Sequence, residues 1–195
     1  METATIDIEA LNAEISKLEQ EVIDAKERLT AAKRKLPPEP VADYTLRNTD
    51  GSEVKLSELF GDKQDLILIH NMGKGCRYCT LWADGFNSSL PHLENRAAFV
   101  LTSPDDPAAQ GEFAASRGWK FKTASVKESS FVKDMGFLKD EGYWPGVSTF
   151  RKHEDGSITR VGKAIFGPGD DFCAVWPFFD LLEGGAKDWE PKLKY

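Results

Sequence analysis

The sequence predicts an α/β sandwich with a central mixed sheet, preceded by a long N-terminal helix. Two apolar runs of strand length, within residues 64–70 and 97–103, are each followed by a stretch of helical pattern. A hairpin pattern over residues 146–167 and a last helical segment over 170–184 then close the domain. This order of elements indicates one sheet, with parallel and antiparallel strands, lying between layers of helix.

The N-terminal helix is indicated by apolar residues spaced alternately three and four apart over about four heptads. These residues are Ile8, Leu11, Ile15, Leu18, Val22, Ala25, Leu29, Ala32 and Leu36. The run ends at the prolines of LPPEP, which cannot continue a helix. Two interpretations stay open: the apolar stripe pairs with a second copy to form a homodimer, or it packs along its own domain. Ala25 and Ala32 permit close packing but weaken a long coiled coil.

We expect three segments in the chain of 195 residues: the helix over 1–36, one domain over 37–185, and a C-terminal tail over 186–195. The domain is predicted to begin with two short strands around a turn at Asp50-Gly51, then a helical turn opened by Ser57. Two helices are expected next, one from about Cys79 to Asn95 and one ending at Gly118, followed by an extended segment over 121–126. The last elements expected are a hairpin with its turn at Asp155-Gly156 and a final helix interrupted or begun at Pro177.

Composition argues against several classes of function. The net charge of −7, with Lys and Arg dispersed along the chain, argues against nucleic acid as the partner. No apolar run approaches the ~20 residues of a membrane span, and the N-terminus shows no secretory pattern. Three cysteines are few for a secreted domain held together by disulfides. We therefore expect a cytoplasmic protein with no nucleic-acid or membrane partner and no cofactor.

The two cysteines of CRYC, Cys76 and Cys79, lie where a central strand gives way to a helix. The N-terminus of a helix favours an anion, and Arg77 adds a positive charge, so a thiolate is favoured there. Cys79 lies three residues on and shares a helix face with Cys76, which is suitable spacing for thiol–disulfide exchange. A zinc site is a weaker alternative because no second close pair of ligands is present, and two structural thiols are another.

At these residues the chain resembles the thioredoxin fold, and more distantly proteins like alkyl hydroperoxide reductase and the peroxiredoxins. It most resembles a bacterial thioredoxin-like family of unknown function, whose members are described as predicted dithiol-disulfide isomerases or oxidoreductases. The shared motifs cover nearly the whole chain and read here RKLP, DY, LSELF, QDL, HNM and CRYCTLWAD. The resemblance therefore implies a thioredoxin-like domain over residues 37–185.

The resemblance assigns catalytic roles to four residues. It makes Cys76 the attacking thiol and Cys79 the resolving one, and it makes Pro145 the candidate for the cis-proline that faces the disulfide. His70 stands six residues before Cys76, where thioredoxin has a buried aspartate. A histidine with its ordinary pKa near ~6.5 could take the proton of the resolving thiol there, or could simply bond a backbone carbonyl.

Three further residues are expected to contact substrate: Arg77 and Tyr78 between the cysteines, and Trp144 beside Pro145. The chain also departs from its relatives. Arg77-Tyr78 replaces the Gly-Pro of thioredoxin, and arginine should make the pair more oxidising. Gly73 stands where peroxiredoxins have a threonine, which argues against a conventional peroxidase.

The remaining candidates have structural interpretations first. Trp82 and Phe86 are expected to pack in the core, and Cys173 to be a buried thiol, with a third redox partner as its alternative role. The segment FGPGDD resembles an Arg-Gly-x-Asp segment of the family, but it lacks the arginine, and it is expected to form a loop and helix cap.

The favoured function is a thiol–disulfide oxidoreductase acting on a disulfide-containing protein or on a small thiol or disulfide. Two alternatives stay open: a thiol peroxidase-like enzyme that resolves a sulfenic acid, and a redox-inactive module that works through its N-terminal helix.

Overall fold

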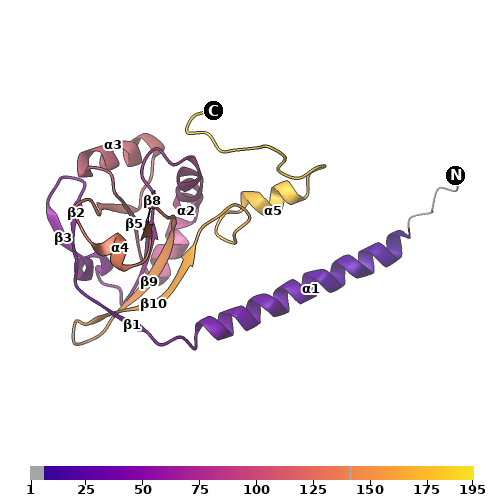
Figure 1. The fold of residues 1–195 in the computed structure, drawn as a ribbon, viewed down its shortest axis with the longest axis horizontal. Helices are drawn as coiled ribbons and strands as arrows, with labels where there is room; N and C mark the ends of the chain where they lie inside the picture. The colour runs from indigo at the N-terminus through magenta and orange to yellow at the C-terminus, as the bar shows by residue number, and fades with distance from the viewer. Residues whose placement is uncertain (1–6, 141) are drawn as a thin grey trace. The chain divides into compact units, whose positions relative to one another are not determined.

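The computed structural model describes residues 7–140 and 142–195, and the chain divides between Pro37 and Pro38 into two compact units (Figure 1). The first unit contains one helix, α1 (Ile8–Lys33), which begins at an N-cap aspartate whose carboxylate accepts a hydrogen bond from Ala10 N–H at 3.0 Å. The helix stops three residues short of the predicted end at Leu36. Proline disfavours helical backbone in the residue before it, so the turn before Pro37 opens.

The second unit is built on an eight-stranded sheet in the order β1-β10-β9-β4-β5-β6-β2-β3. Its strands are β1 (Glu39–Val41), β2 (Thr45–Asn48), β3 (Glu53–Lys55), β4 (Asp65–His70), β5 (Ala98–Ser103), β6 (Lys122–Ser125), β9 (Gly146–Lys152) and β10 (Ile158–Ile165). Strands β4, β5 and β6 run parallel, and β9 pairs antiparallel with both β4 and β10. The expected mixed sheet is confirmed, with the apolar strand β4 near its centre.

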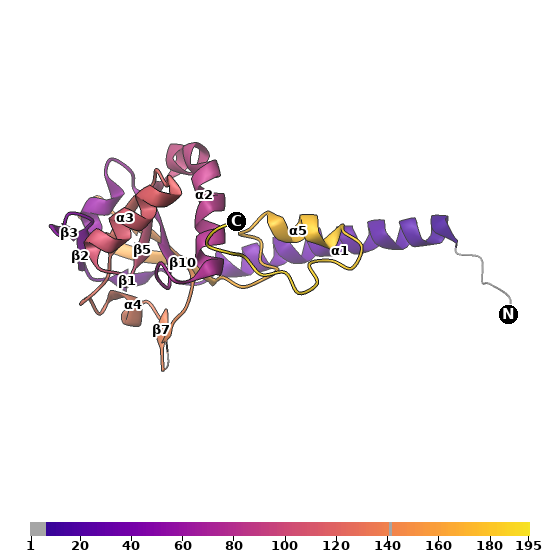
Figure 2. The same ribbon diagram turned by 90° about the horizontal axis from the view of Figure 1, so that it is seen from above.

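Short helices and a small hairpin complete this unit. The helical elements are η1 (Leu56–Phe60), α2 (Arg77–Arg96), α3 (Pro107–Arg117), α4 (Phe131–Asp134) and α5 (Val175–Asp180), and a separate two-stranded sheet is made by β7 (Leu138–Lys139) and β8 (Gly142–Tyr143). Figure 2 shows α2 and α3 on one side of the large sheet and α4 on the other. The element order of a helix-covered α/β sandwich is therefore as predicted.

Two hydrophobic clusters cover the two faces of the sheet. Because side chains alternate along a strand, β4 sends Leu66 and Leu68 into one cluster, with η1 and α4, and Ile69 into the other, with α2. Phe60, Phe131, Phe137 and Phe150 are fully buried in the first cluster, and Trp82 lies in the second. This division decides which side chains can reach the start of α2.

Several local predictions differ from the structure. Helix α2 begins at Arg77, two residues earlier than expected, and α5 covers six residues instead of most of 170–184. The edge strand β1 contains Pro40 and was not expected, but an edge position tolerates a residue that cannot donate a hydrogen bond. Among the described residues, no helix has the length and apolar character needed to cross a membrane.

Candidate functional site

Cys76 and Cys79 are joined by a disulfide across the start of α2, with their Cα atoms 5.2 Å apart. Cys76 is the N-cap residue, and its Sγ accepts a hydrogen bond from Cys79 N–H at 3.1 Å. Cys76 is half-buried, whereas Cys79 is only 3% exposed. The first sulfur is therefore the one that a reactant can approach, and the helix N-terminus offers it favourable electrostatics once it is a thiolate.

Hydrogen bonds anchor the loop that leads from β4 to Cys76. Asn71 Oδ1 accepts from Gly73 N–H at 2.7 Å, and Asp105 Oδ2 accepts from Lys74 N–H at 2.9 Å. Gly73 has φ +114°, and a Cβ on it would lie 3.3 Å from Asp105 Oδ1. The loop therefore requires glycine at this position, and the carboxylate that follows β5 fixes its path.

His70 is buried on the face of the sheet opposite α2. It lies on the same face of β4 as Leu66 and Leu68. Its ring stacks on Phe137 with centroids 3.8 Å apart, and its Nε2 lies 2.9 Å from Ser148 Oγ. Burial, with a smaller contribution from the charge of Arg160, lowers its pKa to about 3. The imidazole is therefore neutral at physiological pH.

These properties favour a structural role for His70, with the Ser148 hydroxyl as its partner in place of the expected backbone carbonyl. Its hydrogen bond and ring contacts among the described residues are with Ser148, Phe131 and Phe137 and not with either cysteine, and its Nδ1 has no partner. The predicted base needs a pKa near that of the proton donor. A group with a pKa of about 3 accepts a thiol proton poorly.

We expect His70 to make the protein lose stability in mild acid. Because the pKa falls from 6.5 in the unfolded chain to about 3 in the folded one, the unfolded chain takes up the proton first, and stability is lost as pH falls from about 6.5 towards 3. The loss between pH 7.5 and 5 should be about 2 kcal/mol. Urea unfolding across this range should show His70→Gln removing the slope, whereas His153→Gln, at an exposed histidine, should retain it. An equal slope in both variants would contradict the assignment.

Pro145 lies at the same edge of the sheet as the cysteine loop, but the expected cis peptide bond is wrong: no cis bond occurs among the described residues, so the Trp144–Pro145 bond is trans. Trp144 N–H donates to Phe137 O at 2.7 Å, and Pro145 O accepts from Phe166 N–H at 2.9 Å. These bonds hold the segment extended into β9, where Gly146 pairs with His70. A trans Trp144–Pro145 bond, the default for an X–Pro peptide, is compatible with this extended path into β9.

The three residues expected to contact substrate have different surroundings. The Arg77 guanidinium pairs with Glu190 Oε2 at 2.9 Å, and the Tyr78 ring lies 6.2 Å from Trp82 and 6.4 Å from Trp176. Trp144 is 44% exposed, with the Lys139 ammonium 4.6 Å from its ring centroid. Arg77 and Trp144 are thus open to solvent, whereas Tyr78 is partly committed to the core.

Other residues singled out in the sequence have structural roles. Trp82 is buried and donates from Nε1 to Asp170 Oδ1 at 3.2 Å, and the same carboxylate accepts from Gly167 N–H and Phe172 N–H, each at 2.9 Å. FGPGDD is thus a loop fixed by its own aspartate. Cys173 is buried, and burial raises the pKa of its thiol, which disfavours the reactive thiolate.

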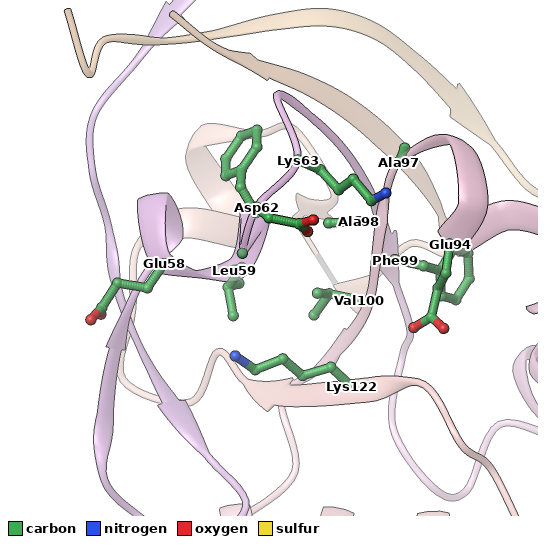
Figure 3. Close-up of a pocket in the computed structure, with 12 residues that line it drawn as sticks. Glu58, Leu59, Asp62, Lys63, Glu94, Ala97, Ala98, Phe99, Val100 and Lys122 are labelled. Atoms are coloured by element: carbon green, nitrogen blue, oxygen red, sulfur yellow. The ribbon is translucent and has the colours of Figure 1, made fainter. Parts of the chain in front are cut away.

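A pocket of about 260 Å³ lies between η1, the end of α2 and β5 (Figure 3). It is lined by charged residues of both signs, including Asp62, Lys63, Glu94 and Lys122. Ala98 lines the pocket at the first residue of β5, whereas Asp105 supports the cysteine loop beyond the last, so the pocket and the disulfide lie at opposite ends of this strand. Among the described residues, no cluster of three or more His, Cys, Asp or Glu is placed to hold a metal ion.

Comparison with known proteins identifies a family and a fold. A family described as "Bacterial protein of unknown function (DUF899)" matches residues 8–193. No curated protein matches the chain. The expected bacterial family of unknown function is thereby confirmed.

Solved structures similar to this chain include peroxiredoxins. A PrxQ mutant from Xylella fastidiosa is 16% identical with a TM-score of 0.57, over 66% of this chain and 84% of that one. Reduced Prx3 from Vibrio vulnificus in complex with hydrogen peroxide is 13% identical with a TM-score of 0.56, over 69% and 90%. Peroxidoxin BcpB from Mycobacterium tuberculosis is 23% identical with a TM-score of 0.51, over 62% and 80%. At these identities the likeness shows the fold alone, a thioredoxin-like sandwich.

Proposed function

This chain belongs to the DUF899 family of bacterial proteins, and on that premise we propose that it is a thiol–disulfide oxidoreductase working through Cys76 and Cys79. The observation that carries the proposal is the unequal exposure of a disulfide at the N-terminus of α2. Cys76 is half-buried and caps the helix, whereas Cys79 is buried behind it. An approachable sulfur beside a protected one is the arrangement that two-step exchange requires.

In the reducing direction, the Cys76 thiolate attacks one sulfur of a substrate disulfide. A Cys76–substrate disulfide forms, the substrate S–S bond breaks, and the departing sulfur takes up a proton. Cys79, as its thiolate, then attacks Cys76 Sγ, so that the second substrate sulfur leaves as a thiol and the Cys76–Cys79 disulfide closes. Two electrons pass from the dithiol to the substrate, and two glutathione thiols or one protein dithiol must return them, forming a disulfide in turn.

The geometry contributes positioning and charge to this exchange. The amide of Cys79 already donates to Cys76 Sγ, and a hydrogen bond of this kind stabilises a thiolate. Asn71 and Asp105 fix the loop in front of the helix, so Cys76 is held at the N-cap. Arg77 supplies a cation next to the attacking sulfur, partly balanced by Glu190. We place the activity in the cytoplasm, where thiol reductants are abundant.

Reduction of a peroxide is the second candidate, because the structural neighbours include Prx3 solved with hydrogen peroxide. In that reaction the Cys76 thiolate attacks one peroxide oxygen, the O–O bond breaks, an alcohol or water leaves after protonation, and Cys76 becomes a sulfenic acid. Cys79 then displaces water to form the disulfide. Gly73, whose φ of +114° disfavours a side chain, stands where the peroxiredoxin motif has threonine. We therefore rank peroxide second.

The proposal is tested by titrating the full chain against glutathione and trapping thiols by alkylation and mass spectrometry. We expect a reversible two-electron transition between about −120 and −270 mV, the range of known oxidoreductases. Turnover is then measured with a protein disulfide and with hydrogen peroxide under the same reductant. Faster turnover of the disulfide supports the first candidate, and peroxide-dependent turnover alone supports the second. Thiols that never pair reversibly would overturn both.

A further inference from the structure

Helix α1 carries an apolar stripe that plays no part in the proposed redox reaction. Taken by itself, the helix buries none of its side chains. We call the stripe the seam, and its residues are Ile8, Leu11, Ile15, Leu18, Val22, Ala25, Leu29 and Ala32. The helix has 26 residues, so the seam runs along about 39 Å.

We propose that the seam binds the seam of a second copy of this chain, in an antiparallel coiled coil. The first observation is the position of the alanines in the heptad repeat. The seam alternates a positions (Ile8, Ile15, Val22 and Leu29) with d positions (Leu11, Leu18, Ala25 and Ala32). When two such helices run antiparallel, each a position faces a d position of the other helix. Centring the pair on Val22 and Ala25 places Ile15 opposite Ala32 of the second copy and Leu18 opposite its Leu29. Each alanine then meets a β-branched side chain, and the layers fill evenly.

A parallel pair packs these side chains poorly. In that arrangement a faces a and d faces d, so Ala25 would face Ala25 and Ala32 would face Ala32 of the second copy. Two layers would then hold only methyl groups, and under-filled layers cost stability. The alanines that weaken a parallel coiled coil are thus the residues that fit an antiparallel one.

The second observation is the charge along the edges of the seam. At the positions just before each a residue, the helix carries Glu14 and Glu21 in its first half and Arg28 towards its end. In the antiparallel register Glu21 meets Arg28 of the second copy. This pair occurs twice by symmetry. Within one helix Glu21 already lies 3.8 Å from Lys17, in a pair whose side chains are 60% and 77% exposed and free to re-form across the seam.

The parallel register brings like charges together at two of its three charged pairs. In that register, the residue just before an a position faces the residue five positions further along the second copy. Glu14 would face Glu19 and Arg28 would face Lys33, whereas Glu21 would face Lys26 in the one attractive pair. Like charges at these positions destabilise a pair. Side-chain volume and charge, which are independent properties of the sequence, both favour the antiparallel arrangement.

Sedimentation equilibrium of the full chain tests the proposal at low salt and micromolar concentrations. We expect a dimer of the 21.7 kDa chain, and Leu18→Asp should be a monomer. Arg28→Glu places Glu opposite Glu21 and should weaken the dimer about tenfold, as should Glu21→Arg. The double variant Glu21→Arg/Arg28→Glu should restore the wild-type dissociation constant. Glu27→Arg, the same reversal on the outer face of the helix, is the matched control.

The outcomes separate the alternatives. In a parallel dimer Arg28→Glu would face Lys33 and tighten association, and this result would overturn the orientation. A monomeric wild-type chain would overturn the proposal and favour a helix covered by its own domain or by another protein. Because the charge variants leave the seam intact, helicity measured by circular dichroism should be unchanged, and rescue by the double variant cannot be attributed to refolding.

Discussion

Replacing Cys76 with serine is expected to reduce disulfide exchange by about a thousandfold or more, to the background of the chain without a nucleophile. The reason lies in exposure. Cys79 is 3% exposed and Cys173 is 7% exposed, so neither can replace the half-buried Cys76 as the attacking sulfur. Burial also raises the pKa of the Cys173 thiol and keeps it protonated. The measurement is the rate at which the reduced chain cleaves a protein disulfide.

Replacing Cys79 with serine should have a different effect from the Cys76 change. The attack by Cys76 is retained, but the second step is lost, so the chain should stop as a mixed disulfide with its substrate. Intact-mass spectrometry would show this adduct, and proteolysis would place it on Cys76. Cys173→Ser is the matched control and should behave as the wild type. With hydrogen peroxide, the same Cys79→Ser variant should instead accumulate a sulfenic acid if peroxide is the substrate.

Equal activity of Cys76→Ser and the wild type would contradict the redox proposal. The chain would then be an interaction module on a thioredoxin-like fold, with a disulfide that only stabilises the start of α2. An adduct that forms on Cys79 in the Cys76→Ser variant would also contradict the exposure argument. Both results are read from the same set of proteins, so the two cysteine variants and the Cys173→Ser control decide between enzyme and scaffold.

The large elements could be predicted because they depend on local patterns. Apolar runs fixed the places of β4 and β5, and the heptad spacing indicated α1. The short elements escaped prediction because tertiary contacts decide them. The edge strand β1 exists through its pairing with β10, and α5 stops after six residues.

The candidate site was predicted in part. The positions of Cys76 and Cys79 follow from a strand-to-helix junction, but the buttressing by Asn71 and Asp105 was missed. A signal existed, since polar residues follow two buried parallel strands whose carboxyl ends meet at one edge of the sheet. Glu190, which pairs with Arg77 from 113 residues away, gives no such signal.

The spacing of motifs along the sequence also could not predict the neutral state of His70 or the trans bond before Pro145. Motif spacing places a residue on a strand, whereas a pKa depends on what packs around the ring. Here Phe131, Phe137 and Ser148 come from segments remote in sequence, and together they remove water from the imidazole.

Substituting Gly146 with alanine is expected to destabilise the fold strongly. Gly146 begins β9 and pairs with His70 on one side and Ile165 on the other. An added Cβ would overlap both the backbone oxygen of Ala164 and the ring of Phe137. Neither neighbour can yield easily, since the carbonyl belongs to β10 and the Phe137 ring is fully buried against His70, with centroids 3.8 Å apart.

Because a rigid backbone atom and a packed ring both oppose the methyl group, we expect Gly146→Ala to cost about 3 kcal/mol or more, the upper part of the range for overpacked cores. For a domain of this size that corresponds to a fall in Tm of about 6–12 °C. Gly85→Ala is the matched control: this glycine lies within α2 with no atom within 4 Å of its added Cβ, so the change should stabilise the helix by about 0.5–1 kcal/mol. Thermal unfolding followed by circular dichroism measures both variants. If Gly146→Ala unfolds with the wild type, the close approach of β9, β10 and Phe137 at the edge of the site is incorrect, and the positions of His70 and Pro145 derived from that register fall with it.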